Sequence, residues 1–582
     1  MRTRFPHQIG FFRIVAYRGL ATKGRVWCRA GSRLARQNCA QLGLVTMSQL
    51  IDYAVRVRSH PRFKWLLATA ILACLFIGYG LYWYASSGRK LVLAAMVAFG
   101  VLPVGALLMA ARGILSSTRG RLIGFAALLS CSCLLFAVLF PPFSVADEFH
   151  HYLSSYWLSE CVTGSTELDR PETVEMRRDD WELYSDHGAR DERNDYQTFT
   201  IDAESYQQVF EEFSWGQRHE GSYEVPEDLM FNFTLGNENV VAKVGSVVGL
   251  LFGRLLGLGA YPVFYLGRIF SAAFFVVCVI AAIRITPVGK NVIMAISFLP
   301  MVLQEAASYS YDGGTIGLSF VFIALVLRAV LGEGALSRRM MVALALFATL
   351  LAPCKAVYVL EVGLILLIPG RRFTSRRVAV AYKAGVLALA ALAVSAGKLA
   401  MVSSVSSGTT TFAFPGERTF SLYDLISDPL GTIFLFARTL DVSADNYWMS
   451  AVGFSLGWLQ QNLVMPSSLM GLYVVGMLYS SQRSEDDAAA LSGGLRAALF
   501  AVAALVWIAV MVSMAVSWTP STSETIQGVQ GRYILPVLPL LMLSFRSGRA
   551  FLSGGSGQIT LALFSGLNAL YMTRFIAIAL SV

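Results

Sequence analysis

Long apolar runs separated by short polar loops recur along most of the chain. Most of them are close to 20 residues long, which as a helix spans a hydrocarbon core about 30 Å thick. We place about thirteen of them, at residues 65–84, 91–112, 122–141, 261–284, 291–309, 314–331, 340–353, 356–370, 379–402, 464–481, 496–517, 532–545 and 558–579. The pattern predicts an all-α polytopic membrane protein.

Two of these runs are short and meet at a proline. Residues 340–353 and 356–370 are joined through Pro353 and Lys355, so they form either a re-entrant hairpin or a tilted pair broken by the proline. The segment 240–258 is apolar and rich in glycine but carries two cations, and we expect it to lie along the outer interface rather than to cross.

Basic residues concentrate in short loops, which sets the expected orientation. These loops hold Arg112, Arg119, Arg121, Arg284, Lys290, Arg338, Arg339, Arg371, Arg372, Arg376, Arg377, Arg546 and Arg549, all on one side if the N-terminus is cytoplasmic; the pair Arg89–Lys90 is the exception. The chain then begins with a basic cytoplasmic segment, 1–64, whose biological start is either Met1 or Met47. Spans 1–3 lie in 65–142, spans 4–9 in 261–402 and spans 10–13 in 464–582. Two extracytoplasmic loops separate them: the acidic loop 143–260, which includes the interfacial helix, and the loop 403–463.

The amino-acid composition supports the membrane assignment and excludes other classes of protein. Only 14% of the 582 residues are charged and 55% are hydrophobic, which excludes a soluble enzyme with one anchor. The net charge of +10 is unevenly distributed: residues 143–240 are strongly negative, with 23 acidic residues and 6 arginines, whereas the rest of the chain has an excess of basic residues. It therefore reflects topology, and no nucleic-acid partner is expected. The eight cysteines show no CxxC pair, which argues against a disulfide or zinc framework.

Carboxylates and histidines follow the third run directly. Pro141 and Pro142 end the helix, and Asp147, Glu148 and His151 come next. A carboxylate at the membrane edge suits general-base work, and the three side chains are also candidate ligands of a divalent metal. The plain alternative is the solvated start of an acidic loop.

Two further groups of polar residues lie at membrane depth. Glu305 and Asp312 are candidate walls of a cavity. A tight outer turn with a Gly313–Gly314 tip would explain Asp312 and the glycines but not Glu305. The cations are Arg268, Lys355, Lys398 and Arg532. We expect Arg268 and Lys398 to snorkel to the headgroups, whereas Arg532, next to Gly531 at the mouth of a span, suits phosphate.

Several common motifs are absent from the sequence. It contains no GxxxxGK[ST] phosphate loop, no HExxH zinc helix, no visible internal duplication and no soluble nucleotide-sugar domain. A glycosyltransferase built on this chain would have to take its donor from the membrane.

The chain resembles the bacterial multi-pass membrane family called domain of unknown function 2142, which is grouped with the GT-C glycosyltransferases. The resemblance covers most of residues 120–546 and rests on PPFSVADEFHHY at 141–152, LGR at 266–268, LPMVLQEAASYSYDGGT around 300–315, PCKAVY at 353–358 and GVQGRYILPVLP at 528–539. Phe149 stands where the family often has proline, and residues 160–240 are unusually acidic.

The resemblance implies a GT-C-like fold with a large outer loop after the third span, a polyprenyl-phosphate-linked sugar as donor, and inversion at the anomeric carbon. It implies Asp147 as the general base, Glu148 and His151 as its orienting or metal-binding neighbours, and Asp312 as a polar wall. Lys355, Gln530 and Arg532 would bind the lipid-phosphate leaving group, and Arg268 is a further candidate contact to substrate.

We therefore expect a glycosyltransferase of the plasma membrane that acts on the outer face and modifies a cell-envelope glycan or lipid-linked acceptor. A divalent metal is its only candidate cofactor. The alternatives are a transporter or flippase of lipid-linked saccharides, for which Glu305, Lys355 and Lys398 would line the path, and a polymerase or ligase that uses an oligosaccharide pyrophosphate donor.

Overall fold

The computed structural model divides the chain into two units, residues 1–64 and 65–582. It describes residues 63–87, 90–167, 173–187, 201–226, 229, 239–407, 417–457, 459, 463–552 and 555–581. Apart from residues 63 and 64, all of these belong to the second unit. The basic segment up to residue 62, including Met47, and the exceptional Arg89 lie outside the described residues.

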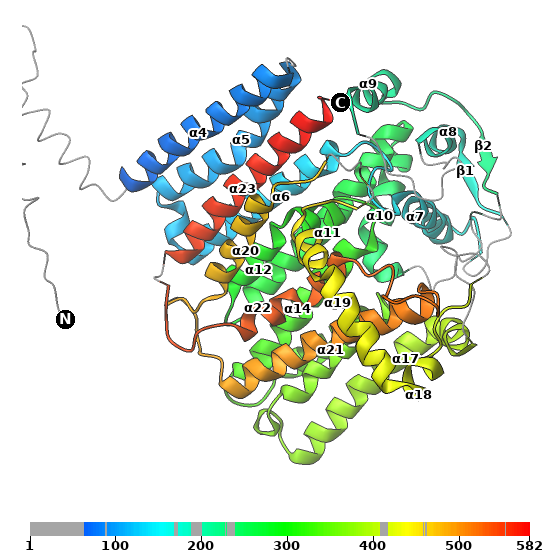
Figure 1. Ribbon diagram of the computed structural model, residues 1–582, viewed down its shortest axis with the longest axis vertical. Helices are drawn as coiled ribbons and strands as arrows, with labels where there is room; N and C mark the ends of the chain where they lie inside the picture. The colour runs from blue at the N-terminus through cyan, green and yellow to red at the C-terminus, as the bar shows by residue number, and fades with distance from the viewer. Residues whose placement is uncertain are drawn as a thin grey trace, which may run out of the picture. The chain divides into compact units, whose positions relative to one another are not determined.

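Helices make up most of the described chain (Figure 1). They are α4 (Phe63–Ser87), α5 (Lys90–Ala111), η1 (Ile114–Ser116), α6 (Thr118–Leu139), α7 (Glu148–Thr163), α8 (Arg178–His187), α9 (Ala203–Glu212), α10 (Val240–Leu255), α11 (Ala260–Ile285), α12 (Lys290–Ser297), α13 (Pro300–Ala306), α14 (Tyr311–Leu331), α15 (Arg338–Leu351), η3 (Ala356–Tyr358), α16 (Val359–Val362), η4 (Gly363–Leu367), η5 (Gly370–Arg372), α17 (Arg376–Ser407), α18 (Leu422–Ser427), α19 (Pro429–Val452), α20 (Ser467–Ser481), α21 (Gly493–Ser517), η6 (Gly531–Val537), α22 (Leu538–Ser544) and α23 (Ser556–Ala579). Strands β1 (Glu175–Arg177) and β2 (Ser222–Glu224) pair antiparallel, with Met176 opposite Tyr223.

Seven helices in the described part of the chain are long and apolar enough to cross a membrane. They are α5, α6, α11, α14, the Arg376–Ser395 part of α17, α21 and α23. This confirms a helical, multi-pass membrane protein. Helix α14 is the most enclosed of the seven, because nearly all of its side chains from Asp312 to Ala329 are buried.

Prolines divide two of the expected spans into shorter pieces. The run 291–309 forms α12 and α13, which separate at Phe298–Leu299 because Pro300 begins a new helix. The run 532–545 forms η6 and α22, with Pro536 inside the 3₁₀ segment. Glu305 belongs to α13, after the first break, and Arg532 lies at the start of η6.

The expected outer loop 403–463 contains a 24-residue helix, α19, that we did not predict. Asp428 caps it by accepting the Gly431 N–H at 2.9 Å, and Pro429 occupies its first position. Its exposed side chains include Ile433 and Phe434, so it presents an apolar face.

Glycines bring α10 against α11. A Cβ on Gly249 would lie 2.5 Å from the Leu266 carbonyl oxygen, and one on Gly245 would lie 2.7 Å from that of Phe270. Small residues spaced four apart allow helix backbones to approach in this way. The opposite face of α10 exposes Val244, Val248 and Phe252, as the expected interfacial helix would, whereas Lys243 is buried.

This close approach makes the α10–α11 contact sensitive to one methyl group. We expect Gly249→Ala to lower the free energy of unfolding by about 1–3 kcal/mol, because the added carbon overpacks a backbone contact. Thermal unfolding of the protein in detergent measures the effect. The matched control is Gly471→Ala in α20, where a Cβ meets nothing within 4 Å. Equal melting temperatures for both variants would contradict the packing described.

Candidate functional site

Five charged side chains from distant parts of the chain meet in one cluster. Arg532 at the start of η6 is its centre: Nη1 lies 3.0 Å from Glu305 Oε1, Nη2 lies 3.3 Å from Asp147 Oδ2, and Nε lies 3.5 Å from Asp312 Oδ2. Lys355 Nζ lies 4.0 Å from Asp312 Oδ1. The structure thus brings Asp147, Asp312, Lys355 and Arg532 together with Glu305, which the sequence had marked with Asp312 as a candidate cavity wall.

Exposure distinguishes Asp147 from the other members of the cluster. Its side chain is 34% exposed, against 1% for Glu305 and 8% each for Asp312 and Arg532. A reactant arriving from solvent or from the membrane edge therefore meets Asp147 first. The buried carboxylates serve to hold Arg532.

The backbone at Asp147 directs this carboxylate away from the helix that follows. Asp147 adopts the left-handed conformation with φ 59°, which aspartate tolerates better than most residues. It precedes α7 but makes no capping hydrogen bond with its side chain. The carboxylate is therefore left for Arg532.

Lys355 reaches the cluster from the break that Pro353 was expected to cause. The segment is extended at Lys355 and continues as η3, α16 and η4, so the expected span 356–370 is a series of short helices. The Lys355 ammonium lies 3.7 Å from the centre of the Tyr533 ring and 5.6 Å from that of Tyr311. We did not assign these tyrosines a role, although both adjoin a predicted site residue.

Local sequence explains the position of Asp312 and Arg532. Ser310 caps α14 by accepting the Asp312 N–H at 3.2 Å. Gly313 and Gly314 lie inside α14 rather than at the tip of a turn. Gly314 lets α14 approach α10 closely, because a Cβ there would lie 2.2 Å from the Ala242 carbonyl oxygen. Gly531 likewise lets the start of η6 approach α19, because a Cβ on Gly531 would lie 2.0 Å from the Tyr447 carbonyl oxygen.

Glu148 and Arg268 form a separate, fully buried pair. Arg268 Nε donates to Glu148 Oε1 at 2.8 Å, and its Nη2 donates to Oε2. Arg268 also donates to the carbonyls of Ala137, Phe140 and Pro141 at the end of α6. Both side chains are 0% exposed. Arg268 therefore does not snorkel and has no surface to offer a substrate, and this pair instead positions the chain that carries Asp147.

The remaining expected residues lie at the margin of the cluster. The His151 ring packs edge-on against Tyr311 with centroids 5.0 Å apart. Gln530 is half-buried, and no side-chain contact to the cluster is seen for it among the described residues. The side chain of Lys398 lies outside those the structure describes.

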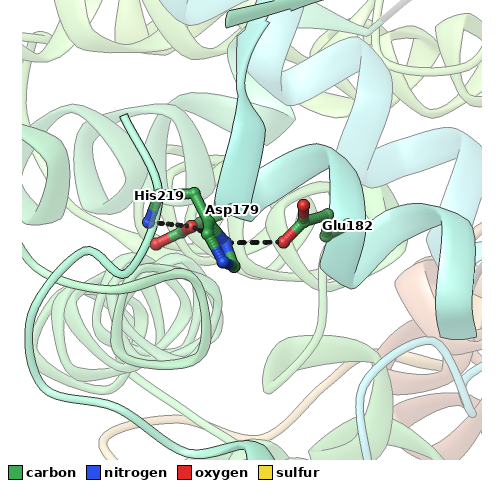
Figure 2. Close-up of side chains that lie close together, drawn as sticks. All are labelled: Asp179, Glu182 and His219. Carbon is green, nitrogen blue, oxygen red and sulfur yellow. Dashed lines mark hydrogen bonds and ion pairs between the residues drawn. The ribbon is translucent and has the colours of Figure 1, made fainter. Parts of the chain in front are cut away.

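The residues after span three do not fit a metal. Glu148 is committed to Arg268, so Asp147, Glu148 and His151 do not converge on one point. In the described part of the chain the one such group of three is Asp179, Glu182 and His219 (Figure 2). His219 Nδ1 lies 3.0 Å from Asp179 Oδ1 and 2.8 Å from Glu182 Oε2. The sequence signal for it was the spacing of two acids on α8, which we did not single out.

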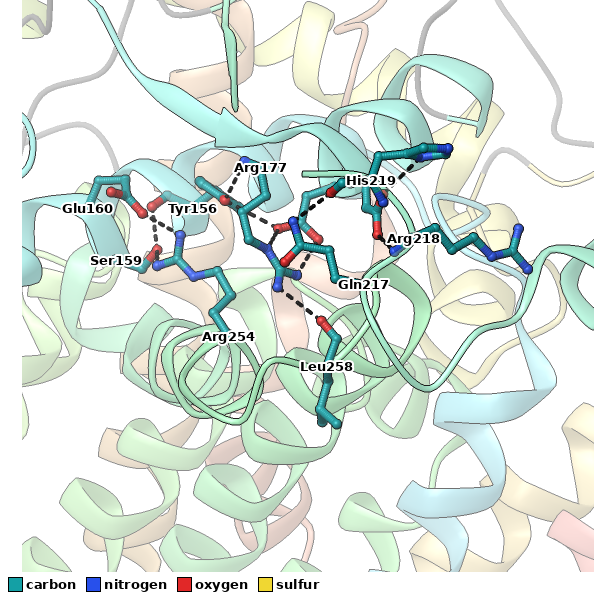
Figure 3. Close-up of polar contacts among 11 residues, drawn as sticks. Tyr156, Ser159, Glu160, Arg177, Gln217, Arg218, His219, Arg254 and Leu258 are labelled. Carbon is teal, nitrogen blue, oxygen red and sulfur yellow. Dashed lines mark hydrogen bonds and ion pairs between the residues drawn. The ribbon is translucent and has the colours of Figure 1, made fainter. Parts of the chain in front are cut away.

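Polar contacts join α7 to α10 and to β1 and α8, which follow α7 in the chain (Figure 3). Arg254 of α10 pairs with Glu160 and donates to Ser159 at 2.7 Å. Arg177 donates to Asp180 through two N–H groups and to the Leu258 carbonyl at 2.9 Å.

Tyr156 of α7 contacts both groups of residues: Arg254 lies over its ring, and its hydroxyl bonds to Asp180 and to the Arg177 N–H. Burial raises the pKa of its phenol, and the Asp180 carboxylate raises it further. Tyr156 therefore stays neutral and donates to Asp180 at 3.2 Å. These contacts hold α7, whose first residue follows Asp147.

The fold and the cluster define a polytopic helical membrane protein with a charged site where several of its helices begin or end. The chain belongs to the family described as predicted membrane protein (DUF2142), whose model matches residues 131–541. No curated protein and no solved structure matches the chain.

The Glu148–Arg268 pair generates a stability prediction. Glu148→Gln leaves the Arg268 charge buried without compensation, and removal of one partner of a buried pair costs about 3–5 kcal/mol. Thermal unfolding and yield of folded protein measure the loss. Glu524→Gln is the control, since Glu524 pairs with Arg438 at 2.8 Å while 72% exposed, and we expect almost no change there. Equal stability of the two variants would refute the role of the pair.

Proposed function

We propose that the protein is a GT-C-type glycosyltransferase that moves a sugar from a polyprenyl phosphate to a cell-envelope glycan or lipid-linked acceptor. The observation that carries the proposal is the partly exposed carboxylate of Asp147, which lies against Arg532 in a cluster that also contains a second cation, Lys355, beside Asp312. Family membership supports the membrane setting.

The chemistry follows from the charges in the cluster. Asp147 takes the proton from an acceptor hydroxyl, whose oxygen then forms a bond to the anomeric carbon of the sugar. The bond from that carbon to the phosphate oxygen breaks, and the electron pair leaves with polyprenyl phosphate. Because attack and departure take place on opposite faces, the configuration inverts. No step requires a metal.

Cations beside the leaving group stabilise the charge that it gains. Arg532 is already shared among three carboxylates, so Lys355 is the more available of the two. The Lys355 ammonium lies over the Tyr533 ring and keeps N–H donors for phosphate oxygens, and the side chain as a whole is 19% exposed.

An apolar groove beside the cluster suits the lipid part of the donor. It has a volume of about 230 Å³ and lies among α19, α21, η6 and α22, with Trp507 and Ile534 in its walls. Ile534 is two residues from Arg532. A chain lying in this groove would place its terminal phosphate near the two cations.

The remaining features of the proposal follow from the sequence. They are about thirteen spans, a cytoplasmic N-terminus, a large extracytoplasmic loop after the third span, and a site on the outer face of the plasma membrane. The basic short loops are the basis for this orientation.

A transporter or flippase of lipid-linked saccharides is the second candidate, and one observation favours it. Three carboxylates surround Arg532, so its guanidinium is already paired before any phosphate binds. Such a cluster also suits coupling of transport to a cation or proton. Transport would move the saccharide without releasing polyprenyl phosphate. A polymerase or ligase would instead release a polyprenyl pyrophosphate.

Release of polyprenyl phosphate in proteoliposomes tests the proposal. With a radiolabelled polyprenyl-phosphate sugar and an acceptor, we expect Asp147→Asn to lower the rate about a hundredfold or more, as loss of a general base does. Lys355→Gln should lower it about a hundredfold, because a cation at the developing phosphate charge is lost.

The matched control is Asp441→Asn, which changes an exposed acid on α19. Normal release by folded Asp147→Asn protein would overturn the catalytic role. Movement of the labelled saccharide across the bilayer without release would establish the transporter instead.

The groove generates a separate prediction about the donor. Ala504 lines it, so Ala504→Phe should raise KM for long-chain donors at least tenfold and leave short-chain donors almost unaffected. Ala501→Phe on the exposed side of the same helix is the control. Equal effects on donors of both lengths would show that the lipid lies elsewhere.

A further inference from the structure

A second polar cavity lies where α6 begins and α11 ends. It has a volume of about 280 Å³, and α12, α20 and the segment after α22 complete its walls. Four basic side chains line it, Arg121, Arg284, Lys290 and Arg546, with the acids Asp486 and Asp487.

Arg546 is a buried cation in this cavity whose donors are only partly used. Its side chain is 1% exposed, and Nη2 pairs with Asp487. Neither Nε nor Nη1 has a hydrogen-bond partner among the described residues. Buried guanidinium donors without acceptors are costly, so an anion in the cavity would satisfy groups that the protein leaves unpaired.

The two acids are occupied by the surrounding structure. Asp487 accepts the backbone N–H groups of Gly289 at 3.1 Å and Ser484 at 2.7 Å, in addition to Arg546. Asp486 pairs with Arg121 at 3.1 Å. Arg284 and Lys290 form no ion pair within the described part of the chain, so the cavity keeps an excess of positive charge.

This cavity is distinct from the cluster around Arg532. Arg268 and Arg284 lie sixteen residues apart on α11, which corresponds to about 24 Å along the helix. Arg268 contacts the end of α6, whereas Arg121 lies near its beginning. The two sites therefore lie at opposite ends of the same helices.

We propose that this cavity binds the phosphate group of an anionic phospholipid. A phosphate offers several acceptor oxygens to Arg546 and compensates Arg284 and Lys290. Ile123 follows the cavity residue Leu122 on α6 and exposes an apolar side chain, along which an acyl chain would extend. The basic residues of the cavity belong to the loops expected on the cytoplasmic side, where anionic lipids concentrate.

Native mass spectrometry of the full-length protein tests the assignment. The protein is equilibrated with phosphatidylglycerol or with phosphatidylcholine, and retained lipid is counted. We expect one tightly retained phosphatidylglycerol and at least tenfold weaker binding in the Arg284→Gln/Lys290→Gln double variant, which leaves the Arg546–Asp487 pair intact. The matched control is Arg338→Gln/Arg339→Gln, a pair of exposed arginines on another basic loop.

Competition with inorganic phosphate separates the two sources of a phosphate ligand. Displacement of the lipid by millimolar inorganic phosphate would support a phosphate site and assign its ligand to a soluble source, whereas resistance to displacement would assign it to the lipid. Equal retention of the two lipids, or unchanged binding by the folded double variant, would overturn the proposal. This experiment measures lipid binding and not sugar transfer, so a result that overturns the lipid site leaves the proposed function unaffected.

Discussion

The structure depends on the compensation of one guanidinium. Arg532 is buried and forms ion pairs with Asp147, Glu305 and Asp312, and a charge in such surroundings is tolerated only when it is paired. Asp147 directly precedes α7, Glu305 belongs to α13, and Asp312 lies in the first turn of α14. These three elements must therefore begin or end close to Arg532. The breaks at Pro300 and before η6 satisfy that demand. The cluster is thus a constraint on the fold as well as a site for chemistry.

Arginines elsewhere in the bundle follow a related rule. Arg268 donates to three carbonyls at the end of α6, and Arg372 donates to the carbonyls of Ala329, Glu333 and Gly334 at the end of α14. The last carbonyls of a helix have no partner within it, and a fork of N–H groups supplies several at once. Arg372, one of the basic loop residues that indicate orientation in the sequence, therefore also satisfies the carbonyls at the end of a helix. A lysine at either position would keep the charge and lose the geometry.

The sequence predicted the helices whose apolar runs were continuous and missed what depends on long-range packing. The limits of α5, α11 and α23 agree with the expected spans to within two residues, because no proline or charge interrupts them in a way that ends the helix. The helix α19 was missed because its charged residues interrupt its apolar pattern.

The same distinction applies to the site. Asp147, Asp312, Lys355 and Arg532 were found because charges in or beside apolar runs stand out in the sequence. Glu148 and Arg268 stood out for the same reason, but only the structure reveals that they pair with each other. Nothing in the local sequence specifies a partner more than a hundred residues away.

The separation of Asp147 from Arg532 has a consequence for how the protein is made. The two residues lie 385 positions apart, and Glu305 precedes Arg532 by 227. During synthesis the three acids are therefore translated well before the arginine that contacts all of them. A ribosome that stops before residue 532 leaves a chain with most of its helices, in which Lys355 is present beside Asp312 but Asp147 and Glu305 lack the arginine that pairs with them.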